Sequence, residues 1–118
     1  MPQPGLVITD VNDVTVVNFR DSSVLDSAAV DNIAKQLYEL VDAQAKRKLV
    51  LDFTDVNFLS SQMIGVMVAL HKKSCNIKGR FVICGLKPRL FEVFKITRLD
   101  KILDFAKDER QAITSFEM

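Results

Sequence analysis

Two short runs of almost wholly apolar residues, KLVLDF at 48–53 and FVICGL at 81–86, flank a longer segment with a broad apolar arc. A strand that reads as continuous apolar sequence is typical of a parallel sheet covered on both faces. Parallel neighbours need a long crossover connection, and the segment from Gln62 to about Ser74 is long enough to supply one as a helix. The sequence therefore predicts a strand–helix–strand unit with a right-handed crossover.

The segments outside this unit extend the same alternation. LVITDV at 6–11 and VTVVNF at 14–19 are β-branched runs separated by Asn12-Asp13, which predicts a hairpin. From Ser27, apolar residues recur at the spacing of one helical face, with Asp26 or Ser27 as the cap; these are Val30, Ile33, Ala34, Leu37 and Val41. Three further elements complete the chain: a helix whose first turn holds Pro88, a strand around 102–105 and an amphipathic helix from about 108 to 116.

The expected fold is one domain over residues 1–118, of the α/β class, or α+β sandwich. Its sheet is mixed and mostly parallel, with an antiparallel hairpin at the amino end and about four helices. In such sheets, functional groups gather where strands end and helices begin. The hairpin also leaves an edge strand that a second copy could pair with, so a homodimer is one possible assembly.

Charge and composition exclude several classes of protein. Sixteen basic against 15 acidic residues give a net charge of +1, which argues against nucleic-acid binding. Lys46, Arg47 and Lys48 are interpreted as a solvated connection. Cys75 and Cys84 lack metal-site spacing and are expected to be buried, and a single histidine cannot complete a zinc site with them.

No signal peptide and no apolar run of membrane-spanning length occurs, so we expect a cytoplasmic protein without direct membrane insertion. The four glycines form neither a phosphate loop nor a dinucleotide fingerprint; they are Gly5, Gly65, Gly79 and Gly85. His71 would lie roughly 15 Å along a helix from Ser61, too far to activate it. We therefore expect no catalytic residue, no cofactor and no metal ion.

Ser60 and Ser61 stand at the start of the second predicted helix, where either could act as a cap. The surrounding segment, LVLDFTDVNFLSSQMIGVMVALHKK, resembles the central part of anti-sigma factor antagonists, the bacterial family built on the STAS domain. In that family a strand ending in Asp leads to Phe, an apolar residue and Asp-Ser-Ser/Thr-Gly at a helix start. The matching residues here are Asp52, Phe58, Leu59, Ser61, Ile64 and Gly65.

The resemblance extends to SSVLDSAAV, where Leu25 and Asp26 align, and to GRFVICGLKPRLFEVFKITRLDKIL, so it covers nearly the whole chain. It implies a module that binds an anti-sigma factor, often itself a serine kinase, and is released by phosphorylation of Ser61, with Ser60 as second choice. The implied partner-binding residues are Asp26, Ser60, Ser61, Gln62, Met63 and Ile64. Ser60 replaces the usual acidic residue and Met63 the usual glycine, where its side chain would add bulk for an approaching partner.

Three functions remain open at this stage. The first is the phosphorylation-switched binding module, part of the transcriptional control of stress responses. The second is a STAS scaffold in a signalling complex or transporter that binds its partner constitutively and has lost the switch. The third is a small enzyme or nucleotide-binding domain, against which the missing phosphate loop argues.

Overall fold

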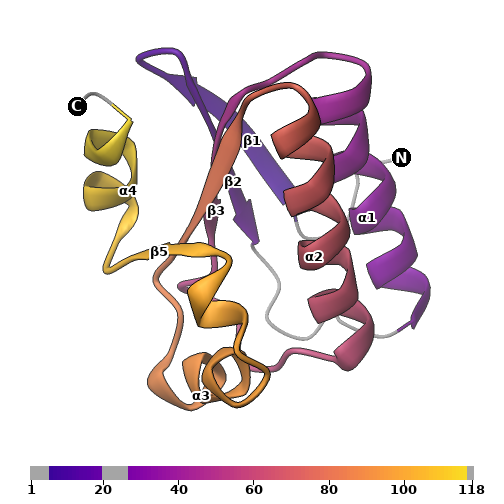
Figure 1. Ribbon diagram of the computed structural model, residues 1–118, viewed down its shortest axis with the longest axis vertical. Coiled ribbons are helices and arrows are strands. Elements are labelled where there is room, and N and C mark those ends of the chain that lie inside the picture. Colours follow the sequence, from indigo (N-terminus) through magenta and orange to yellow (C-terminus); the bar gives the residue numbers. More distant parts are fainter. Residues whose placement is uncertain (1–5, 20–26, 117–118) are drawn as a thin grey trace.

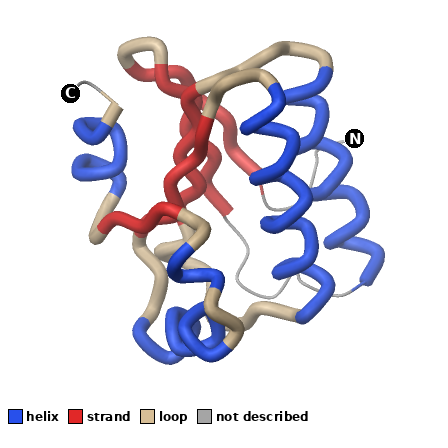
Figure 2. Tube along the Cα trace, in the orientation of Figure 1, coloured by secondary structure: helices blue, strands red, loops and turns tan. Residues whose placement is uncertain are grey.

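The structure is a computed structural model that describes residues 6–19 and 27–116 of the chain. A twisted sheet has α1 and α2 side by side on one face and the short α4 on the other (Figure 1; Figure 2). The described elements are, in order, β1 (Leu6–Val11), β2 (Val14–Phe19), α1 (Ser27–Asp42), β3 (Lys48–Asp52), α2 (Ser61–Asn76), β4 (Arg80–Cys84), α3 (Pro88–Ile96), a 3-10 turn (Leu99–Lys101), β5 (Asp104–Ala106) and α4 (Glu109–Ser115).

The sheet has five strands in the order β1-β2-β3-β4-β5, of which only β1 and β2 pair antiparallel. Asn12 and Asp13 join them with φ angles of 50° and 72°. Positive φ at both central residues is what a tight two-residue hairpin turn requires, because its twist then matches that of the strands. The predicted mixed sheet with an opening hairpin is confirmed.

The central strands are buried on both faces, as their continuous apolar sequence predicts. Neighbouring strands align so that one register row is Val16, Val50 and Val82, and the next is Val17, Leu51 and Ile83. The first row packs toward Ala112 of α4, whereas the second faces the larger core formed with α1 and α2. This packing fixes where each strand ends, and so fixes the position of the loops that follow.

Three details differ from the sequence-based expectations. The second helix begins at Ser61 and continues to Asn76, beyond the predicted 62–74. The last strand lies at Asp104–Ala106, because a 3-10 turn occupies the chain before it. Cys84 is buried as predicted, but Cys75 is exposed, since it lies outside the arc of α2 that faces the core.

Among the described helices, none combines the length and apolarity that crossing a bilayer demands. The longest of them, α1 and α2, have 16 residues each.

Gly79 marks a close approach between the turn that follows α2 and the chain that enters β3. A Cβ atom at this position would lie 2.7 Å from both Cα and the carbonyl oxygen of Arg47. The Arg80 N–H also donates to the Arg47 carbonyl oxygen at 2.8 Å. Only glycine therefore allows these two backbone segments to pack at this distance.

Gly79→Ala should lower the free energy of unfolding by about 1–3 kcal/mol, because the added methyl group overlaps backbone that cannot easily move. Gly65→Ala is the matched control: no described atom lies within 4 Å of its added Cβ, and alanine favours the helix by about 0.5–1 kcal/mol. Urea denaturation of both variants measures the difference. Equal effects of the two substitutions would contradict the close packing at Gly79.

Candidate functional site

The connection between β3 and α2, residues 53–60, runs along the lower edge of the molecule beside α3 (Figure 1). Its first half follows the carboxyl end of β3, and its last residue, Ser60, precedes the first turn of α2. Backbone N–H groups at a helix start lack partners within the helix, so this end carries a partial positive charge. The connection and the first turn of α2, residues 53–64, contain both predicted phosphorylation sites, and the name switch segment, used from here on, refers to that prediction.

Ser60 is the N-cap of α2. Its backbone is extended, with φ −83° and ψ 160°, and the Met63 N–H donates to its hydroxyl oxygen at 3.1 Å. Its carbonyl oxygen accepts the first helical hydrogen bond, from the Ile64 N–H at 3.1 Å. The half-buried Ser60 hydroxyl therefore has a structural role in starting the helix.

Ser61 is the first residue of α2, and its side chain is exposed. Within the described part of the chain, no hydrogen bond holds its hydroxyl group. The two adjacent serines thus differ in environment, one engaged with the helix backbone and the other open to solvent. Of the two serines that the sequence offered as caps, the structure assigns the cap to Ser60, and modification of Ser61 stays a prediction.

The other expected partner-binding residues have different environments. The exposed Gln62 donates from Nε2 to Oδ1 of Asp31 at 2.7 Å, which ties α2 to α1. Ile64 is half-buried. Met63 is 0% exposed, so the expectation that its side chain adds bulk toward a partner is wrong: the first turn of α2 directs it into the core. Asp26 lies outside the described residues.

Phe58 is 60% exposed in the switch segment, two residues before Ser60. Single exposed apolar side chains are common on protein surfaces, and Ile96 is more exposed still at 81%. Aromatic residues are nevertheless enriched in the buried parts of protein interfaces, so the Phe58 ring is a group that a partner could cover. Its neighbour Leu59 is buried, which fixes the backbone and holds the Phe58 side chain outward. The sequence matched Phe58 to a family pattern but gave it no role, since a loop has no periodicity from which exposure can be predicted.

Two cations at the start of α3 form hydrogen bonds with the connection between β3 and α2. Lys87, the N-cap residue of α3, donates from Nζ to the Thr54 carbonyl oxygen at 2.7 Å. Arg89 donates from Nη2 to the Asn57 carbonyl oxygen at 2.7 Å. Hydrogen bonds from charged donors are stronger than neutral ones, so a loop without regular structure is given a defined path. The sequence contained no signal for either contact.

Asp52 anchors the beginning of the same segment. Its carboxylate is 8% exposed, and Oδ1 accepts hydrogen bonds from both the backbone N–H and the hydroxyl group of Thr54. Oδ2 accepts from the Asn18 side-chain amide at 3.1 Å, and that amide also donates to Glu109 Oε2 at 3.2 Å. Asp52 thereby joins β2, β3 and the start of α4 to the switch segment.

Glu109 and Asp52 form a pair of neighbouring carboxyl groups. A hydrogen bond with Asp52 raises the pKa of Glu109, burial raises it further, and the Asn18 amide acts in the opposite direction. Nearby, burial and then the charges of Asp52, Glu109 and Asp108 raise the pKa of the Cys84 thiol to about 12. Cys84 therefore stays protonated and unreactive at neutral pH.

No group of three or more metal-ligating side chains occurs among residues 6–19 and 27–116. His71 lies on α2 with its Nε2 3.7 Å from the Cys75 sulfur, in contact with neither serine. The described residues of the switch segment offer a hydroxyl group, an exposed ring and a fixed helix start. Groups of these kinds occur in surfaces that recognise other proteins.

Comparisons with known proteins agree on one family. The family model described as STAS domain matches residues 6–112. BtrV of Bordetella bronchiseptica, grouped by name with the anti-sigma factor antagonists, is 30% identical over 94 residues, covering 80% of each chain.

Two solved structures share the fold. A STAS domain protein of Planctomyces limnophilus superimposes with a TM-score of 0.86 at 23% identity, covering 96% of this chain and 98% of that one. The Bacillus cell fate determinant SpoIIAA in its phosphorylated form gives a TM-score of 0.73 at 20% identity, covering 94% and 98%.

Ser60→Ala should lower the free energy of unfolding by about 0.5–2 kcal/mol, because the Met63 N–H loses its acceptor. Ser61→Ala should change it by less than about 0.5 kcal/mol, since its side chain is exposed. Urea denaturation of the two variants side by side measures both values. A larger loss for Ser61→Ala than for Ser60→Ala would reverse the assigned roles.

Glu109→Gln should stabilise the protein more at pH 7 than at pH 4. Folding raises the pKa of Glu109 above its reference value of 4.5. Such a group stabilises the folded state at a pH below its unfolded pKa, where it is protonated in both states. This stabilisation is lost as the pH rises through the folded pKa. Glutamine remains neutral throughout, so it avoids repulsion from Asp52 at high pH. Melting temperatures of the variant and the unsubstituted protein from pH 4 to 8 measure this, and a constant difference would contradict the carboxyl pair.

Proposed function

The chain belongs to the STAS domain family, and we propose that it acts as an anti-sigma factor antagonist whose partner-binding surface is the switch segment. The observation that carries this proposal is the exposed Ser61 at the start of α2, beside a serine that already caps the helix. Curated relatives bear the same functional name, including anti-sigma factor antagonists of Paenibacillus polymyxa and Listeria monocytogenes. The partner is an anti-sigma factor that is also a serine kinase.

Phosphorylation of Ser61 is the proposed switch. The phosphate adds about −1.5 to −2 charges at pH 7, at a helix start whose partial positive charge favours an anion. Because Ser60 supplies the cap, the modified Ser61 does not have to leave a structural hydrogen bond. The domain can therefore carry the phosphate without losing the first turn of α2.

The same charge opposes partner binding. In the unmodified protein, the switch segment exposes an apolar ring at Phe58 and, three positions along the chain, a small neutral side chain at Ser61. A phosphate on Ser61 would have to lose its water in that interface, and an unpaired buried charge is strongly unfavourable. Release of the anti-sigma factor follows from this penalty and requires no rearrangement of the fold.

The two departures from the family pattern are compatible with this switch. Ser60 replaces an acidic residue but still caps α2, so the geometry of the helix start is retained. Met63 replaces glycine, yet its side chain is buried and leaves the surface beside Ser61 unobstructed. The missing acidic charge then affects which kinase recognises the segment, while Ser61 still stands as the first residue of α2.

A constitutive scaffold is the second candidate. Gln62 occupies the position of the second hydroxyl residue of the family motif, and its amide bonds to Asp31 of α1. This contact gives residue 62 a structural role in place of a hydroxyl group. It therefore favours a surface that binds its partner without being switched by phosphorylation.

Partner binding should survive Ser61→Ala and fall at least about tenfold with Ser61→Asp, because only the second adds charge to the interface. Phe58→Ala should weaken binding by a similar factor through loss of the apolar contact. Titration against each anti-sigma serine kinase of the same cells measures these affinities. Thr114→Asp, an exposed position on α4, is the charge-matched control and should bind normally.

Phosphopeptide mapping across residues 57–72, on protein purified from growing and stressed cells, completes the test. A phosphate on Ser61 whose amount changes with the condition supports the switch. Unmodified peptide in every condition, together with equal binding by the alanine and aspartate variants, would contradict it and favour the constitutive scaffold.

A further inference from the structure

Five cations gather at the amino ends of β3 and β4, at the opposite end of the sheet from the switch segment (upper part of Figure 1). Lys48 and Arg80 are the first residues of β3 and β4, Lys46 and Arg47 lie in the turn before β3, and Lys78 lies in the turn before β4. This set is named the basic end. The sequence suggested only a solvated connection for the first three residues, and the fold places the other two beside them.

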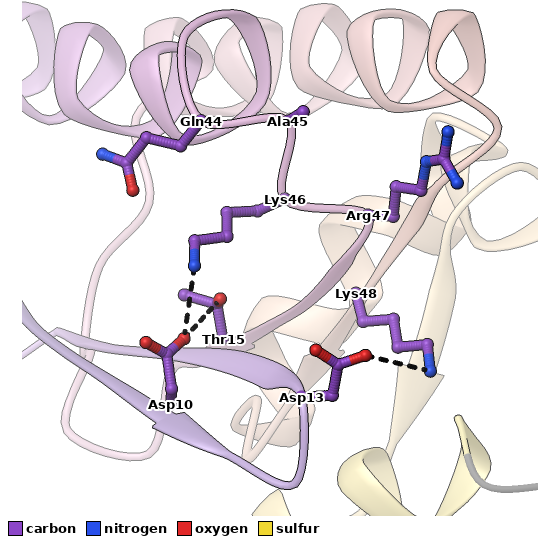
Figure 3. Close-up of a pocket in the computed structure, with 8 residues that line it drawn as sticks. All are labelled: Asp10, Asp13, Thr15, Gln44, Ala45, Lys46, Arg47 and Lys48. Carbon is purple, nitrogen blue, oxygen red and sulfur yellow. Dashed lines mark hydrogen bonds and ion pairs between the residues drawn. The ribbon is translucent and has the colours of Figure 1, made fainter.

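The basic end is hollowed by two adjoining depressions that share Arg47 and Lys48. One has a volume of about 770 Å³ and lies between the turn before β3 and the β1–β2 hairpin (Figure 3). The other has a volume of about 380 Å³, and its charged lining residues are all cations; they are Arg47, Lys48, Lys78 and Arg80. Side chains of a partner can thus enter these depressions, which a flat surface would not allow.

Three of the cations have carboxylate partners, at Lys46–Asp10 (3.8 Å), Lys48–Asp13 (3.8 Å) and Arg80–Asp104 (3.2 Å). All three pairs are solvent-accessible, so each contributes little to stability, and the two lysines can exchange partners. Arg80 is held more firmly, because its guanidinium group also donates to the Ser115 carbonyl oxygen at 3.1 Å and stacks on the Phe116 ring. Figure 3 shows the Lys46 and Lys48 pairs spanning the gap to the hairpin, with Arg47 directed away from them. Within residues 6–19 and 27–116, no carboxylate pairs with Arg47 or Lys78.

The two unpaired cations are held on a rigid support. Lys78 adopts a left-handed conformation with φ 61°, and Gly79 packs directly on the Arg47 backbone. The Arg80 N–H joins the same two turns by donating to the Arg47 carbonyl oxygen. A partner therefore meets charges whose backbone positions are already fixed, which lowers the entropy lost on binding.

We propose that the basic end is a docking surface for an acidic segment of a partner protein, with partner carboxylates pairing with Arg47 and Lys78. The planar Arg47 guanidinium group suits two-pronged binding of a carboxylate. Asp10 and Asp13 rim the larger depression, so the surface has mixed charge and would repel the continuous phosphates of a nucleic acid. Separate glutamate or aspartate side chains can bind the cations and avoid these two carboxylates.

This surface is independent of the switch. Helix α2 has 16 residues and spans about 24 Å between Ser61 and the turn that holds Lys78. Charges at that distance are screened at physiological salt, where the Debye length is about 8 Å. An acidic segment can therefore stay bound while the state of Ser61 changes.

The test uses the full chain and a fluorescein-labelled peptide of about eight glutamates, titrated by anisotropy at low salt. Binding should fall at least about tenfold in the Arg47→Glu/Lys78→Glu variant, because two attractive contacts become repulsive. Lys35→Glu/Lys101→Glu, two exposed positions that do not line either depression, makes the same change in net charge and should stay within about twofold. Ser61→Asp should bind as the unsubstituted protein does.

Arg47→Ala/Lys78→Ala is the second variant, in case charge reversal disturbs folding, and thermal denaturation checks both. Absence of peptide binding by the unsubstituted protein would overturn the proposal. An equal loss of peptide affinity in the two charge-reversed double variants would also overturn it, because binding would then depend on the net charge of the protein and not on the basic end. Tighter binding of a single-stranded RNA of equal charge, or of phosphatidylserine vesicles, would assign the surface to a different class of partner.

Discussion

The buried carboxylate of Asp52 is the interaction on which the functional end of the molecule depends. Asp52 ends β3, a buried central strand, and accepts hydrogen bonds from Thr54, the second residue of the switch segment, and from Asn18 of β2. Asn18 in turn contacts Glu109 at the start of α4. A buried carboxylate is tolerated only when hydrogen-bond donors surround it. Because its donors come from β2 and the switch segment, and Asn18 also reaches α4, the Asp52 carboxylate fixes these parts of the molecule relative to β3.

That arrangement explains how an irregular segment can present a defined surface. Lys87 and Arg89 of α3 hold the carbonyl oxygens of the loop, and the buried Leu59 holds its end against the core. Phe58 and Ser61 are left exposed on this support. The Ser61 side chain takes no part in the hydrogen bonds that hold this segment, so a change at Ser61 leaves them in place. Under the proposed switch, such a change alters only the surface offered to the partner.

The sequence predicted the fold well because local patterns carry its strongest signals. The continuous apolar runs of β3 and β4 indicate strands buried on both faces, the helical spacing in α1 indicates one buried face, and Asn12-Asp13 marks the hairpin turn. The site was predicted less completely. Adjacent serines have the same propensities, so only the Met63 N–H contact separates the roles of Ser60 and Ser61. Burial of Met63, exposure of Phe58 and the lysine and arginine contacts to loop carbonyls depend on tertiary packing.

The two ends of the sheet differ in chemistry for a topological reason. In a parallel sheet the strand starts gather at one edge and the strand ends at the other, so β3 and β4 place Lys48 and Arg80 together and Asp52 opposite them. The start of α2, with Ser61, therefore lies near the carboxyl ends of the strands, where functional groups gather in such sheets, whereas the turns with Arg47 and Lys78 lie at the amino ends. A partner held at the basic end would stay near the switch segment, where a high effective concentration favours rebinding once the modification is removed.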